Sequence, residues 1–474
     1  MESKYIVAIE VGSSLVKGAI GVVNDIGTLK VCAVETREIV DCVRYGCIQN
    51  VEEVRGAVAD IILALENHSN IYPRKVQSVY VSLGGRSLMS YKRDLERDFA
   101  QETEITNEVI YQMLDEARLE PVADKEIVEV LPAGYMVDNK KNANPVGTYG
   151  HNLKMALNII ACRPQIIKNI KRVLEEKMQL NVNDFVVRQM AIAKLVLTSN
   201  EIQLGCVLVD LGAETTTISV HKGDALQSLV TIPMGSRNIT RDLTSLSITE
   251  EQAEKIKCDC VNVNSHEVSV SGAQMVVEGI DDGDISKYVQ SRAGEIVANI
   301  AAQIRESGLK NTDLPEGIIL VGRGAKLKGF NILLESNTSL KVRSGQLPSK
   351  IQIADNSIHP NDEIDVISIL YAATQSNQDA IVECLSEVSK EENDIVEIGF
   401  QGDSDDDDNQ ERIDDGYSDE VEVEVEEDKV KVKEKAPKQP KGPTKFQLLM
   451  EKLKSRLAES LSEEDDDEDD EDDK

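Results

Sequence analysis

The chain has 474 residues and a formal net charge of −33, so Asp and Glu far outnumber Lys and Arg. This charge argues against a nucleic-acid-binding protein, because phosphate backbones are bound by an excess of Lys and Arg. Aromatic residues make up only 3% of the chain and there is no Trp, so we expect a core of Val, Ile and Leu.

The cysteines and the apolar runs indicate the cellular compartment of the protein. The eight cysteines are scattered and form no CxxC pair or Cys/His cluster with zinc spacing, which favours reduced thiols in the cytoplasm. The N-terminus lacks the basic and apolar regions of a signal peptide, and no apolar run is long enough for a membrane-spanning helix. We therefore expect a cytoplasmic protein rather than a transmembrane one.

The first 83 residues predict an α/β unit. Two apolar strands surround a Gly-Ser-Ser turn, followed by an alternating strand, an amphipathic helix and a buried strand that ends in two glycines. In chain order these elements are 5–9, 16–23, 30–40, 51–67 and 76–83. This order favours a mixed sheet.

A second unit is predicted as an insertion at residues 84–162. It begins like a strand, and a capping pattern at Thr106 then opens a helix that runs to about Leu119. Short strands follow around 128–137 and 153–161. The chain then returns to the first unit, with helices expected over 164–177 and 184–198.

Residues 205–390 repeat the layout of the first unit. The stretch VLVDLGAETTTISV (207–220) predicts a hairpin with Asp210 near the end of its buried first strand. Strands at 226–232 and 317–321 and helices at 238–246, 248–258 and 285–307 are expected after it. Duplicated α/β halves that face each other predict a cleft between them.

The two hairpin turns are candidates for phosphate binding. Each follows a carboxylate, Glu10 or Asp210, and its backbone N–H groups and hydroxyls can cradle phosphate oxygens. A carboxylate beside a phosphate site usually holds Mg²⁺, mostly through waters. Facing hairpins would thus grip a nucleoside triphosphate, with Glu10 and Asp210 at the metal. The phosphate candidates are Gly12, Ser13, Ser14 and Lys17 in the first hairpin and Gly212, Ala213, Thr215 and Thr216 in the second.

Either hairpin alone also fits an ordinary β-turn with polar side chains, and only their duplication favours a nucleotide site. The chain has no GxxxxGK[ST] motif, so a P-loop is excluded.

Three further segments fit the same cleft. Glu254 and Lys257 stand three apart on one helix face, where they would meet a ribose or form a solvated charge pair. A strand runs into a glycine loop, where absent side chains let a flat base approach. Gln189 precedes a helix at the return to the first half, where it would orient a water against the γ-phosphate. The candidate loop residues are Gly322, Gly324 and Ala325.

In this order, the segments resemble the phosphate 1, connect 1, phosphate 2, adenosine and connect 2 elements of the actin/Hsp70/sugar-kinase ATPase superfamily. Within it, residues 4–385 resemble the FtsA family of bacterial cell-division actin homologues, also over the stretches 130–138, 144–150 and 232–242. The insertion lies where that family carries its 1C subdomain. The resemblance implies a duplicated actin-like ATPase fold, with subdomain IA at 1–83 and 163–204, 1C at 84–162, IIA at 205–234 and 311–390, and IIB at 235–310.

The resemblance also implies a function. Members of this family bind ATP and Mg²⁺, assemble into actin-like protofilaments, and tether the FtsZ ring to the cytoplasmic face of the cell membrane at the division septum. The contact with the FtsZ C-terminal tail is placed by resemblance at about 235–310. Other divisome proteins are further implied partners.

Several positions depart from the family pattern. An Ala at a position that needs a positive φ would be strained, so phosphate binding would be altered. We expect the chain to be mainly an adaptor and at most a slow ATPase, with Glu10, Asp210 and Gln189 as its catalytic candidates. The departures are Glu10 in place of Asp, Ala213 and Glu214 in a Gly-rich turn, Arg323 at a Gly position, and Arg188 before Gln189.

The C-terminal segment predicts a membrane attachment. Residues 391–443 have the composition of a disordered linker, 444–461 regain helical periodicity, and 462–474 are acidic. An apolar stripe beside Lys and Arg fits a helix lying on anionic lipid, or alternatively a helix that docks on a partner. The acidic end would weaken lipid attachment or keep the free helix soluble. The stripe consists of Phe446, Leu449, Met450, Leu453, Leu457 and Leu461.

Other functions of the same superfamily fit the sequence less well. A small-molecule kinase would need a general base beside a substrate pocket, and the sequence offers no candidate. An Hsp70-like chaperone would need a β-domain that residues 391–474 cannot form. A pilus-assembly protein would share the fold but lack the amphipathic tail.

Overall fold

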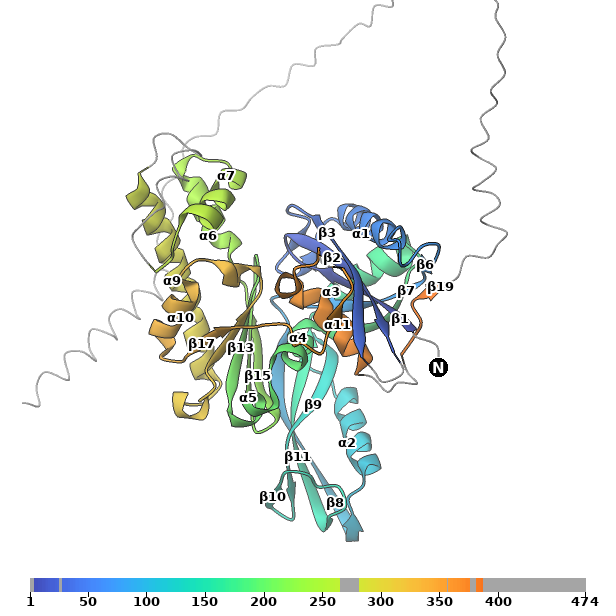
Figure 1. Ribbon diagram of the computed structural model, residues 1–474. Coiled ribbons are helices and arrows are strands. Elements are labelled where there is room, and N and C mark those ends of the chain that lie inside the picture. The colour runs from blue at the N-terminus through green and yellow to red at the C-terminus, as the bar shows by residue number, and fades with distance from the viewer. Residues whose placement is uncertain (1–3, 25–27, 265–280, 356, 376–380, 387–474) are drawn as a thin grey trace, which may run out of the picture. The chain divides into compact units, whose positions relative to one another are not determined.

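The computed structural model describes residues 4–24, 28–264, 281–355, 357–375 and 381–386, all within one compact unit (Figure 1). Within these ranges, no helix is both long and apolar enough to cross a membrane. The predicted linker (391–443), amphipathic helix (444–461) and acidic tail (462–474) lie outside the described residues.

The first half is built on a six-stranded sheet in the order β12-β7-β1-β2-β3-β18. β1, β2 and β3 form an antiparallel meander, whereas β7 and β12 extend it as parallel strands and β18 pairs in parallel with β3. The fold is therefore α/β with a mixed sheet, as the sequence predicts. The strands are β1 (Lys4–Val11), β2 (Leu15–Val23), β3 (Leu29–Glu38), β7 (Ser78–Leu83), β12 (Asn181–Val187) and β18 (Gln352–Ile353).

Helices α1 (Val51–Glu66) and α11 (Ile364–Thr374) pack on this sheet. α1 begins at Asn50, whose side chain accepts hydrogen bonds from the backbone N–H groups of Glu52 and Glu53. A Cβ on Gly18 of β2 would come within 2.4 Å of Ile61. Glycine at that position is therefore what lets α1 pack directly on the strand.

The chain after residue 350 lies with the first half, which differs from the predicted boundary of IIA at 311–390. β18 joins the edge of β3, and the apolar face of α11 is buried on β1 and β2. The short strand β19 (Leu385–Ser386) pairs with β6 (Lys75–Val76). The sequence pattern did not reveal this return, because an apolar helix can be buried equally well on either sheet.

One predicted helix begins too early. Residues 181–187, part of which the sequence assigned to a helix over 184–198, form strand β12 in parallel register with β7. The helix that follows, α4, spans Arg188–Val196. Pairing with a buried neighbouring strand prevails over local helical spacing here, since β-strand preference depends on tertiary context. This correction places Arg188 and Gln189 at the start of α4.

The second half and the insertion share one nine-stranded sheet, in the order β10-β9-β11-β8-β15-β14-β13-β16-β17. The insertion contributes β8 (Met89–Glu104), β9 (Glu126–Val137), β10 (Lys140–Asn142) and β11 (Tyr149–Cys162). The second half contributes β13 (Cys206–Leu211), β14 (Thr216–Lys222), β15 (Ala225–Ile232), β16 (Ile318–Val321) and β17 (Val342–Ser344).

The two parts of this sheet join at a narrow point. Val230 of β15 pairs with Met89 of β8, and Ser90 Oγ accepts a hydrogen bond from the backbone N–H of Leu229 at 2.8 Å. Asn158 of β11 donates its side-chain amide to the carbonyl of Leu226. The insertion thus pairs with the edge strand β15, leaving fewer of its backbone groups without a partner.

Most of the remaining helices pack around the second half and the insertion. α9 contacts α6, α10 and β14, and these elements share a core distinct from that of the first half. The insertion has its own small core, which includes buried residues of α2. The helices are α2 (Asn107–Leu119), α3 (Pro164–Lys171), α5 (Ser199–Leu204), α6 (Arg237–Leu243), α7 (Glu250–Lys255), α9 (Asp282–Glu306) and α10 (Phe330–Thr338); the last short strands are β4 (Val43–Arg44) and β5 (Cys47–Ile48).

A buried histidine of β14 makes stability depend on pH. His221 of β14 is 3% exposed, and its Nε2 lies 3.0 Å from Ser219 Oγ. Burial lowers the pKa of His221 to about 4. Because the folded pKa lies below that of the unfolded chain, the contribution of the neutral ring is complete above about pH 6.5 and is lost as the pH falls toward 4.

We predict that His221→Gln reduces the acid sensitivity of the protein. The difference corresponds to about 3 kcal/mol in the free energy of unfolding when the full shift is expressed. Denaturant unfolding at pH 7.5 and pH 5 detects about 2 kcal/mol of this difference, with the exposed His151 changed to Gln as the control. Equal pH dependence of the wild type and both variants would contradict the prediction.

Candidate functional site

Each of the two hairpin turns is closed by an equivalent backbone hydrogen bond. The N–H of Gly12 donates to the carbonyl of Leu15 at 2.9 Å, and the N–H of Gly212 donates to that of Thr215 at 2.9 Å. A Cβ on either glycine would come within about 3 Å of the carbonyl oxygen that accepts its hydrogen bond. Ala213 has no positive φ, so the strain anticipated there is absent.

Arg188 joins the carboxylates that precede the two turns. Its Nη1 donates to Oε1 of Glu10 on β1 at 2.7 Å, and its Nη2 lies 2.9 Å from Oδ2 of Asp210 on β13. The side chains of Glu10 and Asp210 are 3% and 6% exposed, and that of Arg188 is 16% exposed. The guanidinium thus occupies the position between the two carboxylates where the sequence predicts a metal ion.

Burial and the neighbouring charges shift the pKa values of Glu10 and Arg188. Burial raises the pKa of Glu10 to about 7, although Arg188 opposes the rise. Burial would lower the pKa of Arg188, but Asp210 and Glu10 outweigh that effect and raise it above its usual range. Arg188 is therefore charged at every physiological pH, and it is the nearest cation for both carboxylates.

The arrangement does not fit a Mg²⁺ ion. Mg²⁺ requires near-octahedral oxygen ligands at about 2.1 Å, and here both carboxylates are already bound to one guanidinium. Among the described residues, no group of three or more Asp, Glu, His or Cys side chains is arranged to hold a metal ion. A metal at Glu10 and Asp210 would have to compete with Arg188 for the charge of both carboxylates.

Lys17 is bound to acidic residues around the start of α11. It pairs with Glu10 in the register of β1 and β2, but its Nζ contacts Glu363 Oε2 at 2.9 Å, Asp365 Oδ2 at 2.8 Å and the carbonyl of Asp362 at 2.9 Å. Burial would lower the pKa of Lys17, but Asp365 and Glu363 raise it above its usual value. Lys17 thus fixes the start of α11 to β2, and a phosphate contact would require it to leave these acids.

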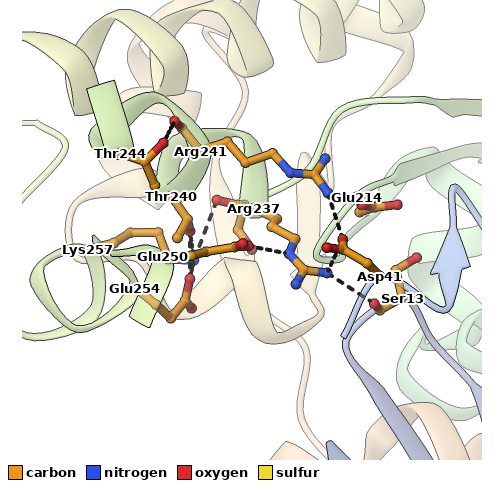
Figure 2. Close-up of polar contacts among 11 residues, drawn as sticks. Ser13, Asp41, Glu214, Arg237, Thr240, Arg241, Thr244, Glu250, Glu254 and Lys257 are labelled. Atoms are coloured by element: carbon orange, nitrogen blue, oxygen red, sulfur yellow. Dashed lines mark hydrogen bonds and ion pairs between the residues drawn. The ribbon is translucent and has the colours of Figure 1, made fainter. Parts of the chain in front are cut away.

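A bridge from α6 connects the two turns, and we call it the α6 arginine bridge (Arg237 and Arg241 with Ser13, Asp41 and Glu214). Figure 2 shows both guanidinium groups pointing toward Ser13, Asp41 and Glu214. Arg237 Nη1 donates to the Ser13 carbonyl at 3.4 Å, and its backbone N–H donates to the Ala213 carbonyl at 2.8 Å. Arg241 lies 3.5 Å from Asp41. The second half therefore contacts the first through α6.

Glu214 holds the centre of this bridge. Its side chain is 1% exposed, Oε1 accepts a hydrogen bond from Arg241 Nη2 at 2.7 Å, and Oε2 accepts one from the backbone N–H of Tyr45 at 2.8 Å. A backbone N–H and a guanidinium are also typical partners of a phosphate oxygen. An internal carboxylate thus occupies, in the second turn, the kind of environment that a phosphate would take.

Glu254 and Lys257, which are predicted to contact a ribose, bind each other and Thr240 instead. Lys257 is 4% exposed; its Nζ donates to Glu254 Oε2 at 2.6 Å and to Thr240 Oγ1 at 3.0 Å, and Thr240 donates to Glu254 (Figure 2). These contacts fix α7 to α6. Lys257 is therefore buried, whereas the Glu254 side chain is 50% exposed, and ribose binding would compete with the contacts of this pair to α6.

Gln189 lies in the core. It is 1% exposed, and its Nε2 donates to the carbonyl of Leu208 and to Ser219 Oγ, both at 3.0 Å. These bonds connect α4 to β13 and β14. Orienting a water against a phosphate would require the side chain to leave both partners.

The remaining predicted residues divide between the pocket and the sheet. Gly322 has φ 89°, and a Cβ there would come within 2.5 Å of Asp210 Oδ1, so the glycine loop packs tightly on the end of β13. A pocket between the halves is lined in part by Asp210, Gly322 and Asp365. Thr216 Oγ1 donates to the Met234 carbonyl at 2.7 Å, so this hydroxyl is bound to the segment that follows β15.

Sequence reasoning missed the partners that organise this site. Arg237 and Arg241 stand four apart, which places them on one face of a helix, and that spacing was a usable signal. Arg188 was noticed only as a departure from a family pattern. Tyr45 and Asp41 had no signal, because their contacts come from a loop far away in the chain.

Comparison with known proteins points to one family. The family model "Cell division protein FtsA" matches residues 207–360, and "SHS2 domain inserted in FTSA" matches 85–161. The cell division protein FtsA of Porphyromonas gingivalis is 29% identical over 392 residues, which is 80% of each chain. The FtsA of Pseudomonas aeruginosa is 27% identical over 358 residues, covering 72% of this chain and 83% of its own.

Among solved structures, the PilM-PilN type IV pilus biogenesis complex aligns with a TM-score of 0.56 at 12% identity, covering 80% of this chain and 98% of that chain. At this level of identity the likeness shows a common fold.

We predict that Lys17→Met lowers the free energy of unfolding by about 3 kcal/mol, because removing one partner leaves half-buried carboxylates without a counter-charge. Denaturant unfolding measures the loss. Lys168→Met, at an exposed position of α3, is the control and is expected to change stability by less than about 0.5 kcal/mol. Similar losses in both variants would show that the Lys17 contacts add little.

Proposed function

The chain belongs to the FtsA family of cell division proteins with an actin-like fold, and from this premise we propose that it is a membrane-attached adaptor of the division ring. The observation that carries the proposal is the order of the two family matches along the chain. The SHS2 match at 85–161 interrupts the first half between β7 and α3, and the FtsA match at 207–360 begins with β13.

We assign attachment to the cytoplasmic face of the membrane to the apolar stripe of residues 444–461. Burying one Leu side chain contributes about 1.5–3 kcal/mol, and each Lys or Arg near an anionic surface adds about 1 kcal/mol. Several such residues on one helix are sufficient for reversible binding. The acidic residues 462–474 oppose it, so attachment is expected to be salt-sensitive.

The proposed partners are a second copy of this chain, in an actin-like protofilament, and the FtsZ C-terminal tail. The FtsZ contact is assigned to residues 235–310. In this proposal the membrane helix concentrates the chain at the septum, and filament formation adds avidity to the individual lipid contacts.

The proposed ligand of the pocket between the halves is ATP. Its phosphates would lie at the Gly12–Ser14 and Gly212–Thr215 turns, its base beside the Gly322–Ala325 loop, and its ribose near Glu254 and Lys257. A triphosphate at the turns would compete with Glu214 for Arg241. Nucleotide would then act by shifting the balance between conformations of the two halves, with hydrolysis slow at most.

We predict that Leu453→Glu reduces the binding of the full chain to vesicles containing phosphatidylglycerol by about tenfold or more, because a charge replaces a side chain of the apolar stripe. Co-sedimentation measures the bound fraction. Ser455→Glu adds the same charge on the opposite face and is the matched control. Undiminished binding by a chain that lacks residues 444–474 would reject the lipid role of this helix.

We predict that Glu214→Gln raises the affinity for ATP by about tenfold, because it removes the internal carboxylate that competes with phosphate for Arg241. Fluorescence titration with a labelled ATP analogue measures the dissociation constant. Glu250→Gln is the control, since Glu250 pairs with Arg237 outside the turn. Weaker binding by Glu214→Gln would mean that this carboxylate supports the site instead of competing with the ligand.

A further inference from the structure

We propose that Arg188 is the resident cation of the nucleotide site, holding Glu10 and Asp210 in place of a divalent metal ion, so that nucleotide binding does not depend on Mg²⁺. The statement about nucleotide rests on the function proposed above. The statement about the cation rests only on the contacts within the chain.

The geometry supports a cation built into the protein. The two guanidinium nitrogens are directed at different carboxylates, one on the first strand of each half, at 2.7 Å and 2.9 Å. A fork of this kind fits one planar guanidinium, whereas a lysine offers a single point charge. The carboxylates that would ligate a metal are therefore already shared by one cation.

The residues around Arg188 oppose its replacement by another cation. Arg188 is the first residue of α4, which follows β12 directly, so its backbone is fixed by the first sheet. Lys17, the other cation near Glu10, is bound to Glu363 and Asp365 and cannot replace Arg188 without leaving them. A divalent ion would compete with the Arg188 guanidinium for both carboxylates, and displacing this largely buried group would leave its charge without partners, which is unfavourable.

An ordinary structural ion pair would have the same distances, so the two roles must be separated by experiment. Removing a purely structural arginine would weaken folding and create no new binding. Removing a resident cation would leave two adjacent buried carboxylates that favour a divalent ion. A metal site gained on removal of Arg188 is therefore the distinguishing result.

The first experiment measures metal binding by the full-length, nucleotide-free chain, with Mn²⁺ as the probe followed by electron paramagnetic resonance. Arg188→Ala is expected to bind one Mn²⁺ more tightly than the wild type, and the double variant Arg188→Ala/Glu10→Gln is expected to lose that site. The acidic tail gives the same background in every variant. Lys194→Ala removes a positive charge from an exposed position of the same helix and is expected to match the wild type.

The second experiment titrates a fluorescent ATP analogue in EDTA and in MgCl₂. The wild type is expected to show dissociation constants within about twofold of each other, and Arg188→Ala to bind at least tenfold more tightly with Mg²⁺. Tenfold or greater Mg²⁺ dependence of the wild type would overturn the proposal.

Two outcomes remain to be separated. Absence of nucleotide binding by the wild type in both buffers would remove ATP from the proposed function, and the Mn²⁺ measurement would still decide the role of Arg188. If Arg188→Ala fails to fold, Arg188→Met, which removes the charge and keeps more of the side-chain volume, takes its place. No gain of a Mn²⁺ site in a folded Arg188 variant would reduce the arginine to a structural contact.

Discussion

The contact on which this site depends is the guanidinium of Arg188 between Glu10 and Asp210. The two carboxylates end the first strands of the duplicated halves, and both are buried, so each needs a positive partner. One fixed cation serves both, which connects the two sheets through three side chains. In this way the structure satisfies by its own residues the charges for which an actin-like fold is expected to use a metal ion.

The same principle applies to the polar groups around this contact. Lys17 is bound to acids at the start of α11, Glu254 and Lys257 fix α7 to α6, and the α6 arginine bridge joins both phosphate turns. Several residues predicted to meet a nucleotide thus have partners within the chain. A ligand entering between the halves would replace existing contacts within the chain. Its free energy of binding would therefore be the gain from the new contacts minus the loss of the old ones.

The insertion adds a mechanical consequence. Its strands continue the sheet of the second half through β8 and β15, and β15 is also paired with β14, which begins just after Glu214. A conformational change in the second turn can therefore be transmitted to the insertion through β14 and β15, which are hydrogen-bonded to each other. For a protein proposed to assemble into filaments, this continuity links the proposed nucleotide site to a surface that lies outside the duplicated core.

The sequence by itself determined the duplicated hairpins, the acids that precede their turns and the glycines within them, because alternating burial and turn geometry are local properties of the chain. It also determined the position of the insertion. Only the tertiary structure decided the partners: Lys17 meets Asp365, Glu214 meets Tyr45, residues 181–187 become a strand beside β7, and the segment after 350 returns to the first sheet. Such choices join residues far apart in the chain, and a local pattern carries no information about which distant group supplies the opposite charge or the neighbouring strand.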